Sequence, residues 1–225
     1  MTSGSIQFGQ YVPNRIFCIG RNYQEHIKEL ATVLPSSQSD EPPKEPAIFM
    51  KPVPCLVPAG QDVHRPPYGR DLHHEVEIVI LIGREGKNLS DDQAGAYIAG
   101  ISLGLDLTLR DVQNELKKRG LPWELSKAFD GSAPIGEFVA YDEKTADLEN
   151  ISFKCSVNGN LRQQGNSSEM IFSIRTIINY LSHRWTLKPG DIIYTGTPSG
   201  VGPLTTGDNI SIQSDPIGEF SWKIV

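Results

Sequence analysis

The segment Asp71-Leu-His-His-Glu-Val-Glu-Ile-Val-Ile-Leu-Ile-Gly83 carries the strongest β-strand pattern in the chain. Successive side chains of a strand point to opposite faces, so the even positions from Val76 to Ile82 would share one face. The odd positions from Glu75 to Leu81 would share the other, and almost all of these residues are apolar. Such a strand is typical of the interior of a sheet, where the carboxylates of Glu75 and Glu77 are unusual.

The rest of the chain also predicts a strand-rich α+β fold. Its 225 residues include 21 glycines and 16 prolines, a share above the average of about 12%, which indicates many turns. Residues 100–110 (GISLGLDLTLR) predict a second buried strand with Asp106 in its middle. The alternating runs on either side of Asn158-Gly159 predict a β-hairpin, because this dipeptide favours the tight turn between paired strands.

Helical spacing of apolar residues predicts helices over residues 23–34, 91–99 and 113–118, and another that opens at the capping pattern of Asn166 and Glu169. Asn22 would cap the first of them. Residues 35–46 contain four prolines and three serines, a composition typical of a loop. Long loops without structure are usually functional lids or disordered, so residues 22–46 are expected to form a helix with a mobile loop attached to it. Residues 1–14 are expected to fray, and residues 15–225 to form one domain.

Three acids in buried strands require a positive partner, because unpaired buried carboxylates cost several kcal/mol each. Glu75 and Glu77 would emerge on one face about 6.5–7 Å apart along the backbone, and Asp106 would come from another strand. An all-oxygen ligand set suits a hard cation such as Mg²⁺ or Mn²⁺. The alternatives are lysine or arginine partners, or a wet strand face. His73 or His74 could add a nitrogen ligand.

His26 and Glu29 form a second candidate pair. They lie three residues apart on the first predicted helix, so their side chains can touch. A carboxylate that holds one imidazole nitrogen leaves the other as a general base. The alternative is an ordinary exposed ion pair on the helix surface.

Lys127 lies among apolar neighbours in Trp123-Glu-Leu-Ser-Lys-Ala-Phe-Asp130, where it would stabilise an anion or simply reach the surface. The stretch Thr195-Gly-Thr-Pro-Ser-Gly-Val-Gly202 lacks both the P-loop pattern and the dinucleotide fingerprint. It predicts either a bend that exposes backbone N–H groups or a plain β-turn. There is no GxSxG nucleophile motif, which argues against an α/β-hydrolase.

Composition excludes several other classes of protein. The net charge is −6 without a basic cluster, so neither nucleic acid nor a membrane surface is an expected partner. No apolar stretch is long enough for a transmembrane helix, and no secretory signal precedes the domain. The three cysteines are widely spaced and odd in number, which favours reduced thiols in a cytoplasmic protein.

Six ordered motifs together resemble the fumarylacetoacetate hydrolase family, and within it the short acylpyruvate hydrolase and oxaloacetate decarboxylase branch. The match spans roughly residues 15–213. The motifs are Gly20-Arg-Asn-Tyr-Gln-Glu-His26, Phe49-Met-Lys-Pro52, Asp71-Leu-His-His-Glu-Val-Glu77, Leu105-Asp-Leu-Thr-Leu-Arg-Asp111, Lys127-Ala-Phe-Asp130 and Tyr194-Thr-Gly-Thr-Pro-Ser-Gly-Val-Gly202.

The resemblance implies a mixed β-sandwich roll with peripheral helices, usually a homodimer, and a helix that orders over the substrate as a lid. It implies a set of site residues of three kinds. They are the Mg²⁺ or Mn²⁺ ligands Glu75, Glu77 and Asp106, the catalytic residues His26, Glu29, Lys127 and Gln113, and the substrate contacts Arg21, Lys51 and Thr197.

The implied reaction is metal-dependent cleavage of the C–C bond of an acylpyruvate, a 2,4-dioxo acid, to pyruvate and a carboxylic acid. The small-molecule substrate is therefore a 2-oxo acid. The same enolate chemistry suits an oxaloacetate decarboxylase or an oxaloacetate keto–enol tautomerase, and the sequence leaves these alternatives open. A cation that only staples a β-rich binding module is the non-enzyme alternative, although such a module has no need of Lys127 or of the pair formed by His26 and Glu29.

Overall fold

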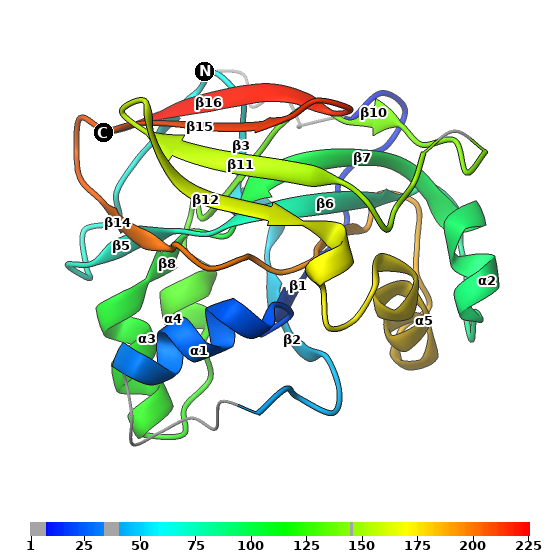
Figure 1. Ribbon diagram of the computed structural model, residues 1–225, viewed down its shortest axis with the longest axis horizontal. Coiled ribbons are helices and arrows are strands. Elements are labelled where there is room, and N and C mark those ends of the chain that lie inside the picture. Colours follow the sequence, from blue (N-terminus) through cyan, green and yellow to red (C-terminus); the bar gives the residue numbers. More distant parts are fainter. Residues whose placement is uncertain (1–7, 34–40, 145) are drawn as a thin grey trace.

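The computed structural model describes residues 8–33, 41–144 and 146–225. Within these residues the main element is a mixed sheet of eight strands, in the order β2-β1-β13-β6-β7-β9-β3, with β10 paired to β7. Figure 1 shows this sheet running through the molecule behind a second sheet. The strands are β1 (Ile16–Gly20), β2 (Ala47–Lys51), β3 (Leu56–Pro58), β6 (Val76–Ile82), β7 (Ile98–Leu105), β9 (Ala133–Ile135), β10 (Val139–Ala140) and β13 (Ile192–Tyr194).

The second sheet has the order β12-β11-β15-β16-β4, and a small third sheet has the order β14-β5-β8. The hairpin between β11 and β12 turns at Asn158 and Gly159, whose φ angles of 51° and 77° suit the tight turn predicted from the dipeptide. The strands are β4 (Asp62–Val63), β5 (Leu72–His74), β8 (Thr108–Leu109), β11 (Ser152–Val157), β12 (Asn160–Asn166), β14 (Gly202–Leu204), β15 (Asn209–Ser214) and β16 (Gly218–Ile224).

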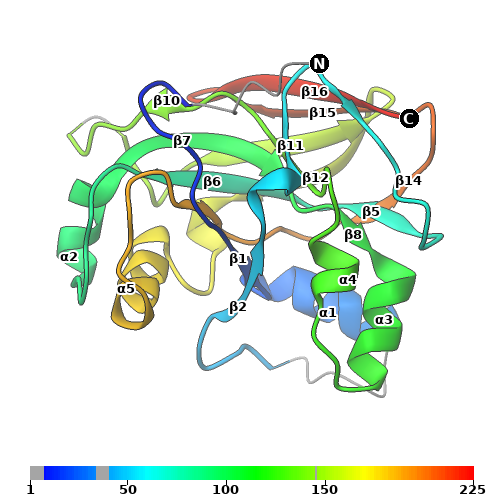
Figure 2. The same ribbon diagram turned by 180° about the vertical axis from the view of Figure 1, so that it is seen from behind.

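The helices are short and lie at the edges of the sheets. The described residues form α1 (Gln24–Val33), α2 (Asp91–Ala94), α3 (Arg110–Lys118), α4 (Glu124–Lys127) and α5 (Ile174–Arg184). In both views α1, α3 and α4 gather at one side, whereas α2 and α5 lie together at the other (Figures 1 and 2). None of the described helices is long and apolar enough to cross a membrane.

The core lies between the two large sheets. Phe153, Ile212 and Trp222 of the five-stranded sheet belong to the same buried apolar cluster as Ile78 and Leu103 of the eight-stranded sheet. Every residue of β6 is buried, as its apolar character on both faces predicts. The strand-rich α+β fold is therefore confirmed.

The predicted strand over residues 71–83 is divided at Glu75. Residues before the break pair with β14 and β8 in the small sheet, and residues after it pair with β13 and β7 in the large one. The second predicted strand similarly ends at Leu105, so Asp106 follows the strand instead of lying in its middle. Both differences have one cause: the chain leaves one sheet and enters another where the buried acids occur.

Some helix boundaries also differ from the predictions. The capping box of Asn166 and Glu169 forms, but it opens a 3₁₀ turn over Ser167–Glu169, and α5 begins later with Ser173 as its N-cap. The helix expected over residues 91–99 is only one turn of α-helix followed by a 3₁₀ turn, Gly95–Tyr97.

The expected frayed N-terminus and lid are described only in part. Residues 1–7 of the former and 34–40 of the latter lie outside the described residues. Residues 8–14 are held to the body of the protein, where the Asn14 N–H donates to the Gly190 carbonyl and Phe8 packs edge-on against Phe138. Fraying is therefore not seen in this part of the segment.

Candidate functional site

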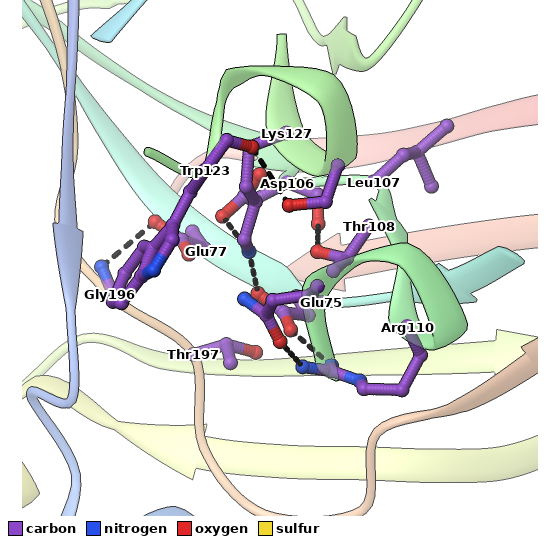
Figure 3. A network of polar contacts seen from close by, with 12 residues as sticks. Glu75, Glu77, Asp106, Leu107, Thr108, Arg110, Trp123, Lys127, Gly196 and Thr197 are labelled. Carbon is purple, nitrogen blue, oxygen red and sulfur yellow. Dashed lines mark hydrogen bonds and ion pairs between the residues drawn. The ribbon is translucent and has the colours of Figure 1, made fainter. Parts of the chain in front are cut away.

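The three predicted acids meet where the chain passes between sheets. Glu75 occupies the break between β5 and β6, Glu77 lies on β6, and Asp106 directly follows β7. The Asp106 N–H donates to the Glu75 carbonyl at 2.8 Å. A backbone hydrogen bond therefore joins the two points at which the predicted strands are interrupted. All three side chains are buried, and one carboxylate oxygen from each lies within 4.8 Å of the others. Figure 3 shows these side chains converging from neighbouring strands.

Basic side chains pair with two of the acids. Lys127, the last residue of α4, donates to Glu75 Oε2 at 2.7 Å and to Asp106 Oδ2 at 2.6 Å. Arg110 donates to the other oxygen of Glu75. Lys51 Nζ lies 2.8 Å from Asp106 Oδ1. The lysine and arginine partners considered from the sequence are therefore present, and Lys127 is a buried residue of the site, not a surface lysine.

Glu77 differs from its two neighbours, because no lysine or arginine of the described residues forms an ion pair with it. Its Oε2 accepts the Gly196 N–H at 2.7 Å. Burial, and then repulsion from Asp106, raises the pKa of Glu77 well above its usual value. Burial also opposes ionisation of Glu75, but Lys127 and Arg110 outweigh it and hold the pKa of Glu75 well below the usual range. Attraction from Asp106 and Glu75 likewise outweighs burial and raises the pKa of Lys127.

The residues present fit a divalent metal ion. Three carboxylates offer the hard oxygen ligands that Mg²⁺ and Mn²⁺ prefer, and they leave about three positions of an octahedral shell for water or substrate. Glu77 has no basic partner among the residues described, so a bound cation would supply the positive charge that favours its ionised form. Neither His73 nor His74 joins the group, since His73 contacts Asp71 and His74 contacts Gln163.

His26 and Glu29 form the predicted pair on α1. His26 Nδ1 lies 3.1 Å from Glu29 Oε2, and the other Glu29 oxygen accepts the Gly200 N–H at 3.0 Å. His26 is only 5% exposed, so the pair is not an ordinary surface contact. Burial opposes ionisation of Glu29, but the hydrogen bonds from His26 and Gly200 outweigh it and lower the pKa of Glu29.

Asn22 does not make the cap predicted for α1. Its side chain instead bonds the backbone of Phe172 and Thr195, and so fixes the start of the helix to the body of the protein.

A small cavity opens in front of the acids. Most of the predicted site residues line it, with the exceptions of Glu29 and of Lys51, which lies behind Asp106. The cavity lining includes Arg21, His26, Glu75, Glu77, Asp106, Gln113, Lys127 and Thr197. Arg21 has a φ of 60°, unusual for a residue with a side chain, at the point where β1 ends and the chain turns toward α1.

The cavity lining also includes residues that were not predicted as site residues, among them the basic residues Arg110 and Lys117 and the ring of Trp123. Arg110 is buried and donates to Gln113 Oε1 at 2.6 Å as well as to Glu75. Its signal in the sequence was a basic residue directly after a buried apolar run. Lys117 lies over the ring of Trp123, with Nζ 5.4 Å from the ring centre. Burial, and then repulsion from Arg110 and Lys127, lowers the pKa of Lys117 to about 8.

Known proteins share both the sequence and the fold. Residues 15–225 match the family described as Fumarylacetoacetate (FAA) hydrolase C-terminal. Oxaloacetate tautomerase FAHD1, mitochondrial, from Bos taurus is 47% identical over 209 residues, which are 93% of this chain and 90% of that protein. Oxaloacetate tautomerase YcgM from Escherichia coli (strain K12) is 42% identical over 205 residues, 91% of this chain and 90% of that one.

A solved structure extends the comparison to bound ligands. The crystal structure of fumarylpyruvate hydrolase from Pseudomonas aeruginosa in complex with Mn²⁺ and pyruvate has a TM-score of 0.88 and 34% identity. The alignment covers 99% of this chain and 93% of that one.

The fold and the buried acids thus belong to a family of enzymes that work on small organic acids. The chain belongs to the fumarylacetoacetate hydrolase family, as its motifs predicted. The two curated relatives are named for oxaloacetate, so the oxaloacetate alternative has more support than the acylpyruvate cleavage that we placed first. The cytoplasmic location stays a prediction.

Proposed function

We propose that this chain is an oxaloacetate keto–enol tautomerase that depends on Mg²⁺ or Mn²⁺. The observation that carries the proposal is the cavity, in which three carboxylates suited to a divalent cation face a set of basic side chains suited to an organic dianion. The names of the curated relatives support oxaloacetate as the substrate. The Mn²⁺ and pyruvate bound by the solved relative support a metal and a 2-oxo acid at one site.

The charges in the cavity favour a substrate with two carboxylates. Arg21, Arg110, Lys117 and Lys127 line it together with the three acids. A divalent cation adds two positive charges, which leaves the cavity positive and able to bind a dianion. Lys127 and Arg110 are already paired with the acids, and Arg21 donates to the Glu41 carbonyl, so we assign the second carboxylate to Lys117.

In tautomerisation a proton moves from C3 of oxaloacetate to the oxygen on C2, and the enolate is the intermediate of this transfer. His26 is the residue that we assign to this transfer. Its Nδ1 is held by Glu29, so when Nδ1 carries the hydrogen, Nε2 has a lone pair that can accept the C3 proton. The same nitrogen can return the proton to the enolate oxygen.

Lys127 would support the charge that develops on the substrate. Its raised pKa keeps the ammonium group protonated near neutral pH, and an oriented cation in a buried site stabilises an enolate oxygen more than water does. Glu75, Glu77 and Asp106 would hold the metal, which when bound supplies Lewis-acid stabilisation of the enolate.

The direct test follows the enol absorbance of oxaloacetate after mixing with the purified protein. We expect faster keto–enol equilibration than the spontaneous rate when Mg²⁺ or Mn²⁺ is present, and the spontaneous rate after treatment with EDTA. A rate that equals the spontaneous one in saturating metal would disprove the proposal. Loss of CO₂, measured in parallel, separates tautomerisation from decarboxylation.

Acylpyruvate hydrolysis is the second candidate, and a specific arrangement favours it. The pair formed by the buried His26 and the partly exposed Glu29 could equally activate a water molecule at the distal carbonyl, and the solved relative is a fumarylpyruvate hydrolase. Fumarylpyruvate is also a dianion, whereas acetylpyruvate carries one carboxylate. Pyruvate release from each of the two substrates, with and without metal, measures this activity against the tautomerase rate.

A further inference from the structure

The side chain of Gln163 makes four hydrogen bonds directly beneath the cavity. It extends from β12 of the five-stranded sheet and is 1% exposed. Its Oε1 accepts the Val76 N–H at 3.0 Å and faces His74 Nδ1 at 2.8 Å. Its Nε2 donates to Thr197 Oγ1 at 2.8 Å and to the Pro198 carbonyl at 2.9 Å. Every donor and acceptor position of this amide is therefore used.

The chemistry of two backbone groups fixes which way the amide points. The Val76 N–H can only donate, so it requires the oxygen of Gln163, and the Pro198 carbonyl can only accept, so it requires the nitrogen. It follows that Thr197 Oγ1 receives a hydrogen from Gln163. His74 must in turn donate from Nδ1 to the same oxygen of Gln163.

This fixed direction determines what Thr197 can do. A hydroxyl group has one hydrogen to donate, and when its oxygen accepts a bond from Gln163 that hydrogen stays available. Thr197 lines the cavity, as Glu75 and Arg110 do (Figure 3). Its hydroxyl is thereby set up as a donor toward an oxygen of a molecule in the cavity.

Gln163 also holds the chain that carries the acids. Val76 lies between Glu75 and Glu77, at the point where the chain leaves the small sheet for the large one. Its N–H is bonded by the Gln163 side chain. A single buried amide thus links the backbone between two of the candidate metal ligands to the side chain of Thr197.

We infer that Gln163 is a positioning residue, which orients the Thr197 hydroxyl as a hydrogen-bond donor to the anionic 2-oxo acid. The inference rests on the proposed function, because it takes the 2-oxo acid from there. Gln163 itself does not touch the substrate. Its effect should therefore pass through Thr197 and appear in substrate binding more than in the proton transfer.

A double-mutant cycle tests this coupling. Gln163→Glu keeps the shape and both acceptor contacts of the side chain, but the ionised form cannot donate to Thr197. Thr197→Val keeps the shape and removes the hydroxyl. We measure the dissociation constant of oxalate, a small mimic of the 2-oxo acid, by calorimetry with the metal-loaded protein, and KM and kcat for oxaloacetate alongside.

Each single variant is expected to weaken oxalate binding about tenfold, the value of one hydrogen bond to a charged group. The double variant should be no more than about twofold weaker than Thr197→Val alone, because interacting residues are not additive. KM should rise in the same proportion while kcat changes by less than about threefold. Independent losses that multiply to about a hundredfold would overturn the inference.

Two further variants keep the test decisive if Gln163→Glu does not fold. Gln163→Met removes the amide without adding a charge, and Thr197→Ser restores the hydroxyl in the smallest side chain that carries one. Thr197→Ser should bind oxalate as the wild type does. Equal binding by wild type and Thr197→Val would overturn the inference without any variant of Gln163.

The outcomes separate this inference from the proposed function. A wild type that binds oxalate and shows the coupling, but does not accelerate oxaloacetate tautomerisation, would overturn the proposed reaction alone. A wild type that accelerates the reaction but shows additive losses would overturn the role of Gln163 alone. If the metal-loaded wild type does not bind oxalate, the inference about Gln163 is overturned, whatever the tautomerase assay shows.

Discussion

The floor and the wall of the cavity are built in different ways. The floor, formed by Glu75, Glu77, Asp106 and Lys127, is held by paired strands and by ion pairs that are nearly free of solvent. The wall is helix α1, which the side chains of Asn22 and Glu29 tie to the body. Changes in the floor should alter stability and metal binding together, whereas changes in the wall should alter turnover with little loss of stability.

Removal of the metal should have the largest effect, because it acts on the whole floor. Lewis-acid stabilisation contributes several kcal/mol, and each 1.36 kcal/mol is tenfold in rate, so we expect turnover to fall by roughly 10³-fold or more after EDTA. Added Mg²⁺ or Mn²⁺ should restore it and raise the melting temperature. If turnover persists in protein that elemental analysis shows to be metal-free, the floor does not act through a metal, and its distinction from the wall is lost.

Lys127→Met is the next test of the floor. It leaves Glu75 and Asp106 without a shared cation, and removal of one member of a buried ion pair costs about 3–5 kcal/mol. We expect this loss in urea unfolding of the metal-free protein, and a smaller loss with saturating Mn²⁺. Lys188→Met, which removes an exposed ion pair with Glu85, is the matched control and should be near neutral. An equal effect of both variants would contradict the buried network.

His26→Gln moves the test to the wall. Loss of a general base lowers turnover by about 10²–10⁴-fold, and we expect a value near the lower end because glutamine still fills the space. The free energy of unfolding should change by less than about 1 kcal/mol, because glutamine retains most of the volume of the imidazole. Stopped-flow rates and urea unfolding measure the two quantities. A large loss of stability would show that the wall is built like the floor.

The sequence predicted the floor better than the connections around it. Glu75 and Glu77 stood out because carboxylates are rare in apolar strands, and Lys127 because lysine is rare among apolar neighbours. The break at Glu75 was missed, since periodicity within one segment does not report which sheet each half joins. Gln163 was missed for a related reason: its four partners lie 34 to 89 residues away in sequence, and an ordinary glutamine in a hairpin gives no local signal.

The lid shows the same limit. The spacing of His26 and Glu29 predicted their contact, because it is local. It could not predict that Asn22 anchors the helix to Phe172 and Thr195 instead of capping it, since those partners are more than 100 residues away.

Glu29→Gln sharpens the account of the wall through its dependence on pH. The pKa of Glu29 is lowered in the folded protein. Its carboxylate therefore stabilises the fold when the pH is above 4.5, the ordinary pKa of a glutamate. This contribution is lost as the pH falls through the lowered folded pKa. The melting temperature of the wild type should therefore exceed that of Glu29→Gln at pH 7, and the gap should close at acidic pH. A gap that is constant with pH would assign the difference to packing.

Lys28→Ala should have the smallest effect, although Lys28 lies on the same helix as His26. Its ammonium group pairs with Glu25 at 2.7 Å, but both side chains are more than half exposed. Exposed pairs on a helix contribute about 0.3–0.5 kcal/mol, so stability should change by no more than that amount and turnover should stay at the wild-type rate. The pair has the same three-residue spacing as His26 and Glu29. A strong effect here would mean that α1 as a whole, and not the pair of His26 and Glu29, sets the rate.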